Sequence, residues 1–252
     1  MEIILGLDVS THCIGVTIAS ENDGELKILN VTHLRLKIPT KIKGTESLFK
    51  KSQLFTNYLD KLKEFNITKV VIEEPLIGSN NSLTVSILLR FNGMISQSVY
   101  QKLGVIPYFI SSYDARKYAF PELMAVRKFN KKGDMYPTST IRKSIKKNEL
   151  VLFGNYAWDC MKKLILWNKI SELYPNIEWV YDKNGELRDE NFDASDSLIC
   201  VMGYTNMNKY KNSEPIITSY YEKEDDNEII FEYEVNFCDN TYEQTITLTK
   251  NN

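Results

Sequence analysis

The sequence predicts an α/β fold: a mixed five-stranded sheet flanked by helices, with a β-rich addition at the C-terminus. Three observations predict it. Three strand-like segments with tight connections open the chain, and amphipathic helical patterns then alternate with short apolar segments. The residues beyond about 213 alternate like strands that are joined by polar turns.

The first three strands are expected to form an antiparallel meander. The segment "EIILGLDVS" reads as a buried strand that ends at Asp8, and "CIGVTIAS" and "LKILNVTHLRLK" follow it, with a turn at "ENDGE". Consecutive strands with tight connections pair antiparallel, so these segments should occupy one edge of the sheet.

Helices and strands should alternate in the next part of the chain. Apolar residues at helical spacing predict helices over about 45–65 and 81–102. Between them, "KVVIEEP" is a short β-branched strand that ends at Glu73, because Pro75 stops it. "VIPYFIS" is then a fifth strand. Strands that alternate with helices indicate parallel neighbours in the sheet.

The second half of the chain is less regular. The stretch 113–147 contains Pro121 and Pro137 and predicts a short helix followed by a mobile loop. Helices are expected at about 155–174 and 192–208, with a small hairpin between them that turns at Asn184-Gly185. We expect a domain over 1–210, with a basic insertion at about 113–150, and a β-rich extension over 211–252.

Composition excludes several classes of protein. The 252 residues are 43% hydrophobic, and no apolar run approaches the roughly 20 residues that span a bilayer. The N-terminus lacks the basic region of a signal peptide. Four cysteines without a C-x-x-C pair, beside two histidines, argue against a zinc site and for reduced thiols. We therefore expect a cytoplasmic protein with no membrane contact and no organic cofactor.

The net charge of −2 hides two regions of opposite charge. Residues 113–147 carry ten basic and three acidic side chains, whereas 213–243 carry ten acidic side chains and one basic. Clustered bases predict contacts with DNA phosphates, although a solvated surface is the alternative. The acidic tail should then lie away from the DNA, or gate it. The bases are Arg116, Lys117, Arg127, Lys128, Lys131, Lys132, Arg142, Lys143, Lys146 and Lys147.

Four carboxylates are placed where a catalytic site would need them. Asp8 and Glu73 end two strands, and Asp193 and Asp196 lie three residues apart where the last helix begins. Each alone has an ordinary interpretation, as a turn residue or a helix cap. Together they would repel one another unless cations neutralised them, and ligation by oxygen alone favours Mg²⁺ or Mn²⁺. A pair of such ions suits phosphodiester hydrolysis, because one activates water and the other stabilises the leaving oxygen.

Three segments carry a resemblance to a known family. "ILGLDVSTHCIGVTIAS", "VVIEEPLIGSNNSLTVSILLRFNGMI" and "DASDSLICVMGY" resemble, in order, the motifs of RuvC-type Holliday-junction resolvases of the RNase H-like superfamily. The resemblance covers roughly 3–110 and 155–207, and Ser197 replaces the usual alanine.

The resemblance implies an RNase H-like fold and a crossover junction endodeoxyribonuclease. Asp8, Glu73, Asp193 and Asp196 would be the catalytic, metal-binding acids, with two Mg²⁺ or Mn²⁺ ions per site. The enzyme would be a homodimer that nicks opposing strands of a four-way DNA junction. In this family the helix after the second acid lines the dimer interface, so Leu76 and Ile77 are candidates for an apolar wedge. Lys162 and Lys163 are candidates for a basic residue near the site.

Three other functions remain open. Another RNase H-like nuclease, which acts on flaps, forks or RNA–DNA hybrids, would use the same four acids. A non-catalytic junction-binding protein would not need four acids together. Sugar kinases and actin-like ATPases share the first motif, but they need a second lobe and glycine-rich loops, and this chain has 11 glycines and no Gly-Gly pair. The Lys-, Asn-, Ile- and Tyr-rich composition is compatible with a phage or virus, which would place the protein in a host cytoplasm.

Overall fold

The computed structural model describes residues 1–75, 81–210 and 213–250. The chain forms two compact units, each built from two separate segments. The first unit comprises Met1–Ala115 and Lys163–Thr205, and the second comprises Arg116–Lys162 and Asn206–Asn252. Leu76 and Ile77, the candidate wedge, lie outside the described residues. The predicted domain bounds, 1–210 and 211–252, stay a prediction.

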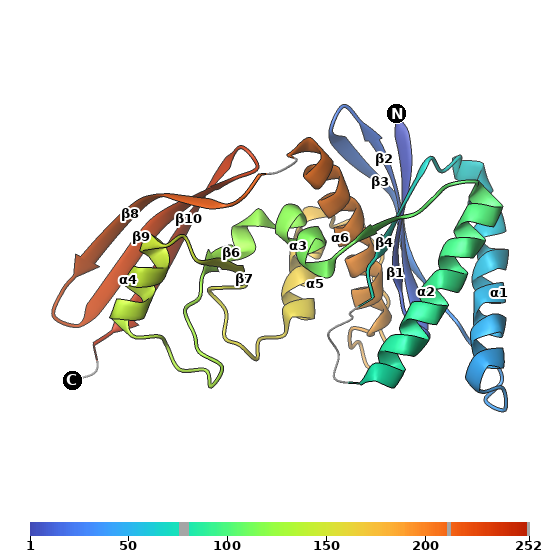
Figure 1. Ribbon diagram of the computed structural model, residues 1–252, viewed down its shortest axis with the longest axis horizontal. Helices are drawn as coiled ribbons and strands as arrows, with labels where there is room; N and C mark the ends of the chain where they lie inside the picture. The colour runs from blue at the N-terminus through green and yellow to red at the C-terminus, as the bar shows by residue number, and fades with distance from the viewer. Residues whose placement is uncertain (76–80, 211–212, 251–252) are drawn as a thin grey trace. The chain divides into compact units, whose positions relative to one another are not determined.

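The first unit is built on a five-stranded sheet with the order β3-β2-β1-β4-β5 (Figure 1). Strands β1, β2 and β3 pair antiparallel, whereas β4 is parallel to β1 and β5 is parallel to β4. This is the sheet of the RNase H-like fold, so the predicted fold class is confirmed. The strands are β1 Glu2–Val9, β2 Cys13–Asn22, β3 Glu25–Arg35, β4 Lys69–Glu73 and β5 Tyr108–Ile110.

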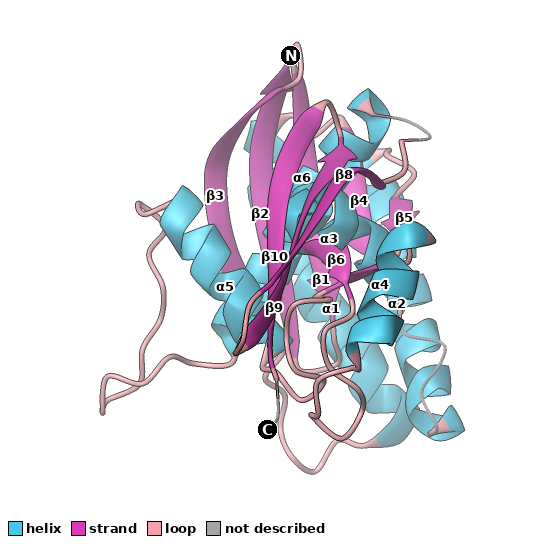
Figure 2. Ribbon diagram, turned by 90° about the vertical axis from the view of Figure 1, so that its left-hand side faces the viewer, coloured by secondary structure: helices cyan, strands magenta, loops and turns pink. Residues whose placement is uncertain are grey.

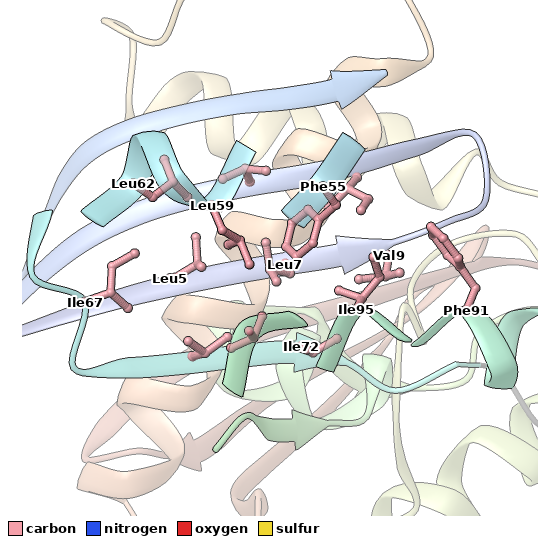
Figure 3. Close-up of a cluster of buried hydrophobic side chains, with 14 of the residues drawn as sticks. Leu5, Leu7, Val9, Phe55, Leu59, Leu62, Ile67, Ile72, Phe91 and Ile95 are labelled. Atoms are coloured by element: carbon pink, nitrogen blue, oxygen red, sulfur yellow. The ribbon is translucent and has the colours of Figure 1, made fainter. Parts of the chain in front are cut away.

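Two long helices cover one face of this sheet. They are α1, Gly44–Leu62, which a 3₁₀ turn extends over Lys63–Phe65, and α2, Ser82–Leu103. Side chains alternate along a strand, and every second residue of β1 belongs to the core against these helices (Figure 3). The buried side chains of this core include Leu5, Leu7, Val9, Phe55, Leu59, Ile72, Phe91 and Ile95.

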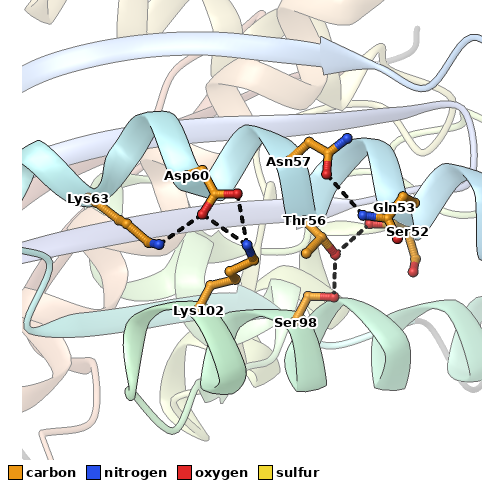
Figure 4. A network of polar contacts seen from close by, with 8 residues as sticks. All are labelled: Ser52, Gln53, Thr56, Asn57, Asp60, Lys63, Ser98 and Lys102. Atoms are coloured by element: carbon orange, nitrogen blue, oxygen red, sulfur yellow. Dashed lines mark hydrogen bonds and ion pairs between the residues drawn. The ribbon is translucent and has the colours of Figure 1, made fainter.

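Polar contacts tie α1 to α2 at the rim of this core (Figure 4). The hydroxyls of Thr56 and Ser98 lie 2.9 Å apart, and the ammonium of Lys102 donates to both carboxylate oxygens of Asp60 at 2.8–2.9 Å. These contacts fix the register between the two helices.

Helix α6, Glu190–Lys209, packs on the opposite face of the sheet. Its side chains are buried almost all round, which matches its apolar sequence after Asp196. A Cβ atom at Gly6 or Gly15 would overlap main-chain atoms of α6, so the helix backbone touches strands β1 and β2 at these glycines. Helix α5, Lys162–Leu173, also belongs mostly to this unit and buries Leu166 and Ile170.

The second unit contains a three-stranded antiparallel sheet of order β10-β9-β8 (Figure 2). Its strands are β8 Ile216–Glu224, β9 Glu228–Phe237 and β10 Asn240–Thr249. Helix α4, Thr138–Lys146, packs on it and buries Ile141 and Ile145 beside Phe231 and Val235. The strand-like alternation of the tail predicted this C-terminal β addition correctly.

The basic stretch contains more regular structure than the short helix and loop that we expected. After α3, Ser112–Ala119, a 3₁₀ turn at Pro121–Leu123 leads into β6, Met124–Val126, which pairs with β7, Leu150–Leu152. The prediction failed because the four-residue spacing of Ile141 and Ile145 is short and their burial depends on a sheet about a hundred residues later.

One further prediction was wrong in extent. The helix expected at 155–174 begins at Lys162, because Phe153 has a positive φ of 60° and the following residues form a loop. The small hairpin expected around Asn184-Gly185 is present: Tyr181 and Leu187 pair antiparallel, and main-chain hydrogen bonds join Asp182 to Glu186 and Arg188 to Val180. Among the described residues, no helix is both long enough and apolar enough to cross a membrane.

Candidate active site

The pairing of β1 with β4 places two acids next to each other. Leu7 pairs with Ile72, so Asp8 and Glu73, the residues that follow, lie at the carboxyl ends of adjacent parallel strands. Leu7 and Ile72 face the core under α1 and α2. By alternation Asp8 and Glu73 face the opposite side of the sheet, where α6 packs.

Helix α6 supplies the other two acids to the same face. Gly15 is the pairing partner of Asp8 in the β1–β2 ladder, and a Cβ at Gly15 would overlap the main-chain oxygen of Asp193. Asp193 therefore lies over the strand position beside Asp8. Asp196 follows one turn later and is buried, with 5% of its surface exposed. The contact of glycine with helix backbone is what allows the helix this close to the sheet.

The start of α6 bears on the alternative that Asp193 and Asp196 are helix caps. The helix begins at Glu190, so Asp193 lies in the first turn and Asp196 in the second, and neither is the N-cap residue. Glu190 is buried and pairs with Arg35, and its Oε2 lies 3.3 Å from Nε of Arg188. This ion-pair group holds the helix start against the end of β3.

Ser197, which replaces the alanine of the motif that the sequence resembles, has hydrogen-bond partners within the fold. Its hydroxyl lies 2.8 Å from that of Thr17 on β2 and donates to the main-chain oxygen of Ala194 at 2.7 Å. The substitution thus adds a buried hydrogen bond between α6 and the sheet instead of an unpaired polar group.

The acids influence one another electrostatically. Burial raises the pKa of Asp8 well above its ordinary value, and the negative charges of Glu73, Asp196 and Asp193 raise it further, while Lys163 lowers it. Burial also raises the pKa of Asp193, against the lowering effects of a hydrogen bond from Cys13 and the charge of Lys163. Four carboxylates with one nearby lysine leave an excess of negative charge on this face of the sheet.

Two cysteines that we did not predict as site residues border the acids. Burial, and then the charge of Asp193, raise the pKa of Cys13 to about 12, so its thiol is neutral and donates to Asp193. Sγ of Cys200 lies 3.9 Å from Oε2 of Glu73. Alternation along β2 could have predicted Cys13, because it lies two residues before Gly15 and so shares its face.

The donor chemistry fits divalent cations. Asp8, Glu73, Asp193 and Asp196 offer carboxylate oxygens alone, the set that Mg²⁺ and Mn²⁺ prefer. Within residues 1–75, 81–210 and 213–250, no three His, Cys, Asp or Glu side chains are already arranged to hold a metal ion. Carboxylates without a counter-ion repel one another, so we expect these side chains to draw together when cations bind.

The two candidate lysines, Lys162 and Lys163, have different surroundings. Lys163 is close enough to lower the pKa values of Asp8 and Asp193. Lys162 belongs to the second unit, where its ammonium lies 5.6 Å and 5.8 Å from the ring centres of Phe153 and Trp158. Lys163 is therefore the candidate that the structure places beside the acids.

The ten predicted DNA-binding bases lie in the second unit and differ in their surroundings. Lys117 is buried and pairs with Glu214 at 2.7 Å, and Arg142 donates from Nε to Glu222 at 2.9 Å. We leave these two out of the set proposed to contact DNA. Arg116 lies half-buried on α3. The other seven are exposed or half-buried: Arg127, Lys128, Lys131, Lys132, Lys143, Lys146 and Lys147.

No protein-family model matches the sequence, and no curated protein sequence matches it. Solved structures do match. Thermus thermophilus RuvC in complex with a Holliday junction substrate is 9% identical, with a TM-score of 0.47, covering 83% of this chain and 96% of that one. Fowlpox virus resolvase with substrate Holliday junction DNA is 10% identical, with a TM-score of 0.33 and coverage of 81% and 96%. An Aquifex aeolicus Ppx/GppA family protein is 19% identical, with a TM-score of 0.31 and coverage of 47% and 38%. The chain is thus structurally similar to two resolvases over more than 80% of its length.

Proposed function

We propose that this chain is a metal-dependent, structure-selective DNA endonuclease that resolves four-way (Holliday) junctions by paired nicks. One observation carries the proposal. Two strand ends and one helix direct Asp8, Glu73, Asp193 and Asp196 to one face of an RNase H-like sheet, where the charges of the other three acids raise the pKa of Asp8. Repulsion among the carboxylates destabilises the fold unless bound cations neutralise their charges.

The four acids would hold two Mg²⁺ or Mn²⁺ ions. When bound, the ions supply Lewis-acid charge that activates water and stabilises the leaving oxygen. Because Asp8 and Glu73 lie on neighbouring strands and Asp193 and Asp196 on one helix, the sheet and the helix fix the spacing of the ligands.

Other side chains would position these ligands. Cys13 donates to Asp193, and the Arg35–Glu190 pair anchors the first turn of α6. Lys163 lies close enough to lower the pKa values of Asp8 and Asp193 and would attract the scissile phosphate. None of these four side chains would contact a metal ion.

The substrate part of the proposal comes from the motif resemblance and from charge. The resemblance selects a four-way junction and a homodimer. The exposed bases of the second unit would bind phosphates of the junction arms, independently of sequence. Helix α2 exposes Leu83, Leu89 and Tyr100, with 69%, 46% and 53% of their surfaces exposed, which supports a role for this helix in dimerisation.

The proposal is tested by incubating the protein with labelled DNA substrates, once with Mg²⁺ and once with a chelator. The substrates are four-way junctions, flaps, forks, RNA–DNA hybrids and plain duplex. Paired, symmetric nicks in the junction alone, dependent on Mg²⁺ and leaving 5′-phosphates, are the expected result. Cutting of flaps, forks or hybrids instead would support the proposed metal site but identify a different substrate. Binding without metal-dependent cutting of any substrate would leave a non-catalytic protein.

A matched pair of variants connects the activity to the site. Glu73 faces α6, whereas its neighbour Glu74 is exposed. Glu73→Gln should abolish cutting, and Glu74→Gln should leave it nearly unchanged. Equal losses from the two variants would count against the assignment of Glu73 as a ligand.

A further inference from the structure

An exposed tryptophan in the second unit is surrounded by positive charge. Trp158 has 44% of its surface exposed. The guanidinium carbon of Arg127 lies 4.7 Å from its ring centre, and the ammonium groups of Lys131 and Lys162 lie at 5.4 Å and 5.8 Å. We call these four residues the Trp158 cluster. The proposed function uses Arg127 and Lys131 as phosphate contacts, but it gives Trp158 no role.

The loop that carries Trp158 is held in place by its backbone. Gly154 packs so closely on β6 that a Cβ would overlap the main-chain oxygen of Ala125, and its own oxygen accepts from the main-chain N–H of Lys128 at 2.8 Å. The side-chain amide of Asn155 donates to Gln244, which donates in turn to the main-chain oxygen of Glu122 at 2.9 Å. The indole is therefore presented from a fixed support.

A second turn brings Lys131 to the ring. Oδ1 of Asn130 accepts from the main-chain N–H groups of Lys132 and Asp134 at 2.8 Å and 3.1 Å, which closes a tight turn around Lys131. Phe129 and Met135 pair across the base of this turn. Trp158 and its three cations thus come from two separate stretches of sequence, 127–131 and 158–162, that the fold brings together.

The positive charge of the Trp158 cluster has no internal acid to balance it. In the described part of the chain, Arg127, Lys131 and Lys162 form no ion pair, unlike Lys117 and Arg142 of the same unit. The nearest acid in sequence, Asp159, is exposed. Cation–π attraction at an exposed ring is weak, so three like charges around one indole favour an anionic ligand.

We propose that the Trp158 cluster binds an unpaired nucleotide of DNA, with the base stacked on the indole and the flanking phosphates bound by Arg127, Lys131 and Lys162. Aromatic rings stack with any base, and basic side chains beside them follow the backbone. Lys131 and Lys162 are exposed and have long, flexible stems, so an incoming base displaces them from the ring toward the phosphates. The choice of DNA rests on the proposed function, but the binding does not involve the four acids.

Fluorescence anisotropy in chelator tests this directly, because binding is then measured without cutting. The probes are an oligo(dT) of about 15 nucleotides and a blunt duplex of similar length. Trp158→Ala should weaken binding of the single strand about fivefold or more and leave binding of the duplex nearly unchanged. Trp158→Phe, which keeps an aromatic face, should retain most of the affinity for the single strand.

Two controls separate stacking from general effects. Tyr221 is an exposed aromatic residue on β8 with 61% of its surface exposed, and Tyr221→Ala should leave both affinities unchanged. Tryptophan emission should be quenched by oligo(dT) in the wild type and much less in Trp158→Phe. If Trp158→Ala weakens binding of single strand and duplex equally, the cluster contacts phosphates only and the stacking proposal is overturned. No weakening of single-strand binding would also overturn it.

This result and the activity are independent. Single-strand binding that depends on Trp158, in a protein that cuts no junction, would overturn the proposed function and keep this inference. Junction cutting with no effect of Trp158→Ala on single-strand binding would support the proposed function and overturn this inference.

Discussion

Carboxylates in the two units have opposite surroundings. In the first unit, burial and three other acids raise the pKa of Asp8. In the second unit, hydrogen bonds from Arg142 and Tyr220 lower the pKa of Glu222 from 4.5 to about 2, and Glu214 pairs with the buried Lys117. The second unit therefore neutralises acids of its tail with its own bases, whereas the first gathers four acids beside one lysine.

The comparison separates structural charge from charge that a ligand must balance. A paired carboxylate stabilises the fold, and removing its partner is costly. Mutually repelling carboxylates destabilise the fold unless cations bind them, and this is the basis of the proposed metal site. The same reasoning applies to the bases: Lys117 and Arg142 have acids as partners, whereas those around Trp158 do not.

The largest effect is expected from Asp8→Asn. The amide cannot replace a carboxylate as a ligand of a divalent cation, so cleavage should fall by more than the roughly 10- to 100-fold typical of a lost outer-shell partner. Junction binding should be almost unchanged, because most of the proposed phosphate contacts lie in the other unit. Cleavage rates and binding isotherms check both parts, and retained cleavage, or lost binding, would contradict the assignment.

Replacing Gly15 should damage the site through the backbone. In Gly15→Ala the new methyl group overlaps the main-chain oxygen of Asp193, so α6 must shift. We expect a loss of about 1–3 kcal/mol in the free energy of unfolding and a clear loss of cleavage. Gly93→Ala, in α2 with open space around it, is the control and should be neutral or slightly stabilising. Urea unfolding measures both, and equal stability of Gly15→Ala and wild type would show that α6 does not need this contact.

Charge reversal at exposed bases should act on affinity alone. Lys131→Glu with Lys132→Glu should weaken junction binding and reduce the dependence of log K on log[salt] by about 2, if each lysine contacts one phosphate. Lys223→Glu, an exposed lysine on the acidic sheet, should change little. Binding measured across salt concentrations decides this, and an unchanged slope would remove the turn around Lys131 from the DNA surface.

The smallest effect concerns the paired carboxylate of the second unit. Because the folded pKa of Glu222 is about 2, against an ordinary 4.5, its stabilisation is complete above pH 4.5 and is lost as the pH falls toward 2. Glu222→Gln should therefore cost about 1 kcal/mol near neutral pH, allowing for solvent screening, and almost nothing near pH 2. Urea unfolding at the two pH values measures the difference. Glu232→Gln, exposed on the same sheet, is the control, and a cost that does not depend on pH would assign the effect to packing.

Much of the first unit could be predicted from the sequence. Its strands and helices have strong local patterns, and the ends of β1 and β4 follow from where those patterns stop. Asp8 and Glu73 were therefore placed at adjacent strand ends once the sheet order was assumed. The helix over 155–174 failed for the opposite reason, because Trp158 and Met161 look like a buried helix face but are exposed in a loop.

The sequence by itself determined the fold class, the positions of four acids at element ends and the excess of bases in 113–147, because each depends on local order along the chain. Only the tertiary structure decided which charges are balanced. Lys117 meets Glu214 across 97 residues and Arg142 meets Glu222 across 80, and Trp158 meets Arg127 and Lys131 from the earlier stretch 127–131. Such pairs depend on how distant segments pack, which no pattern within a short window contains.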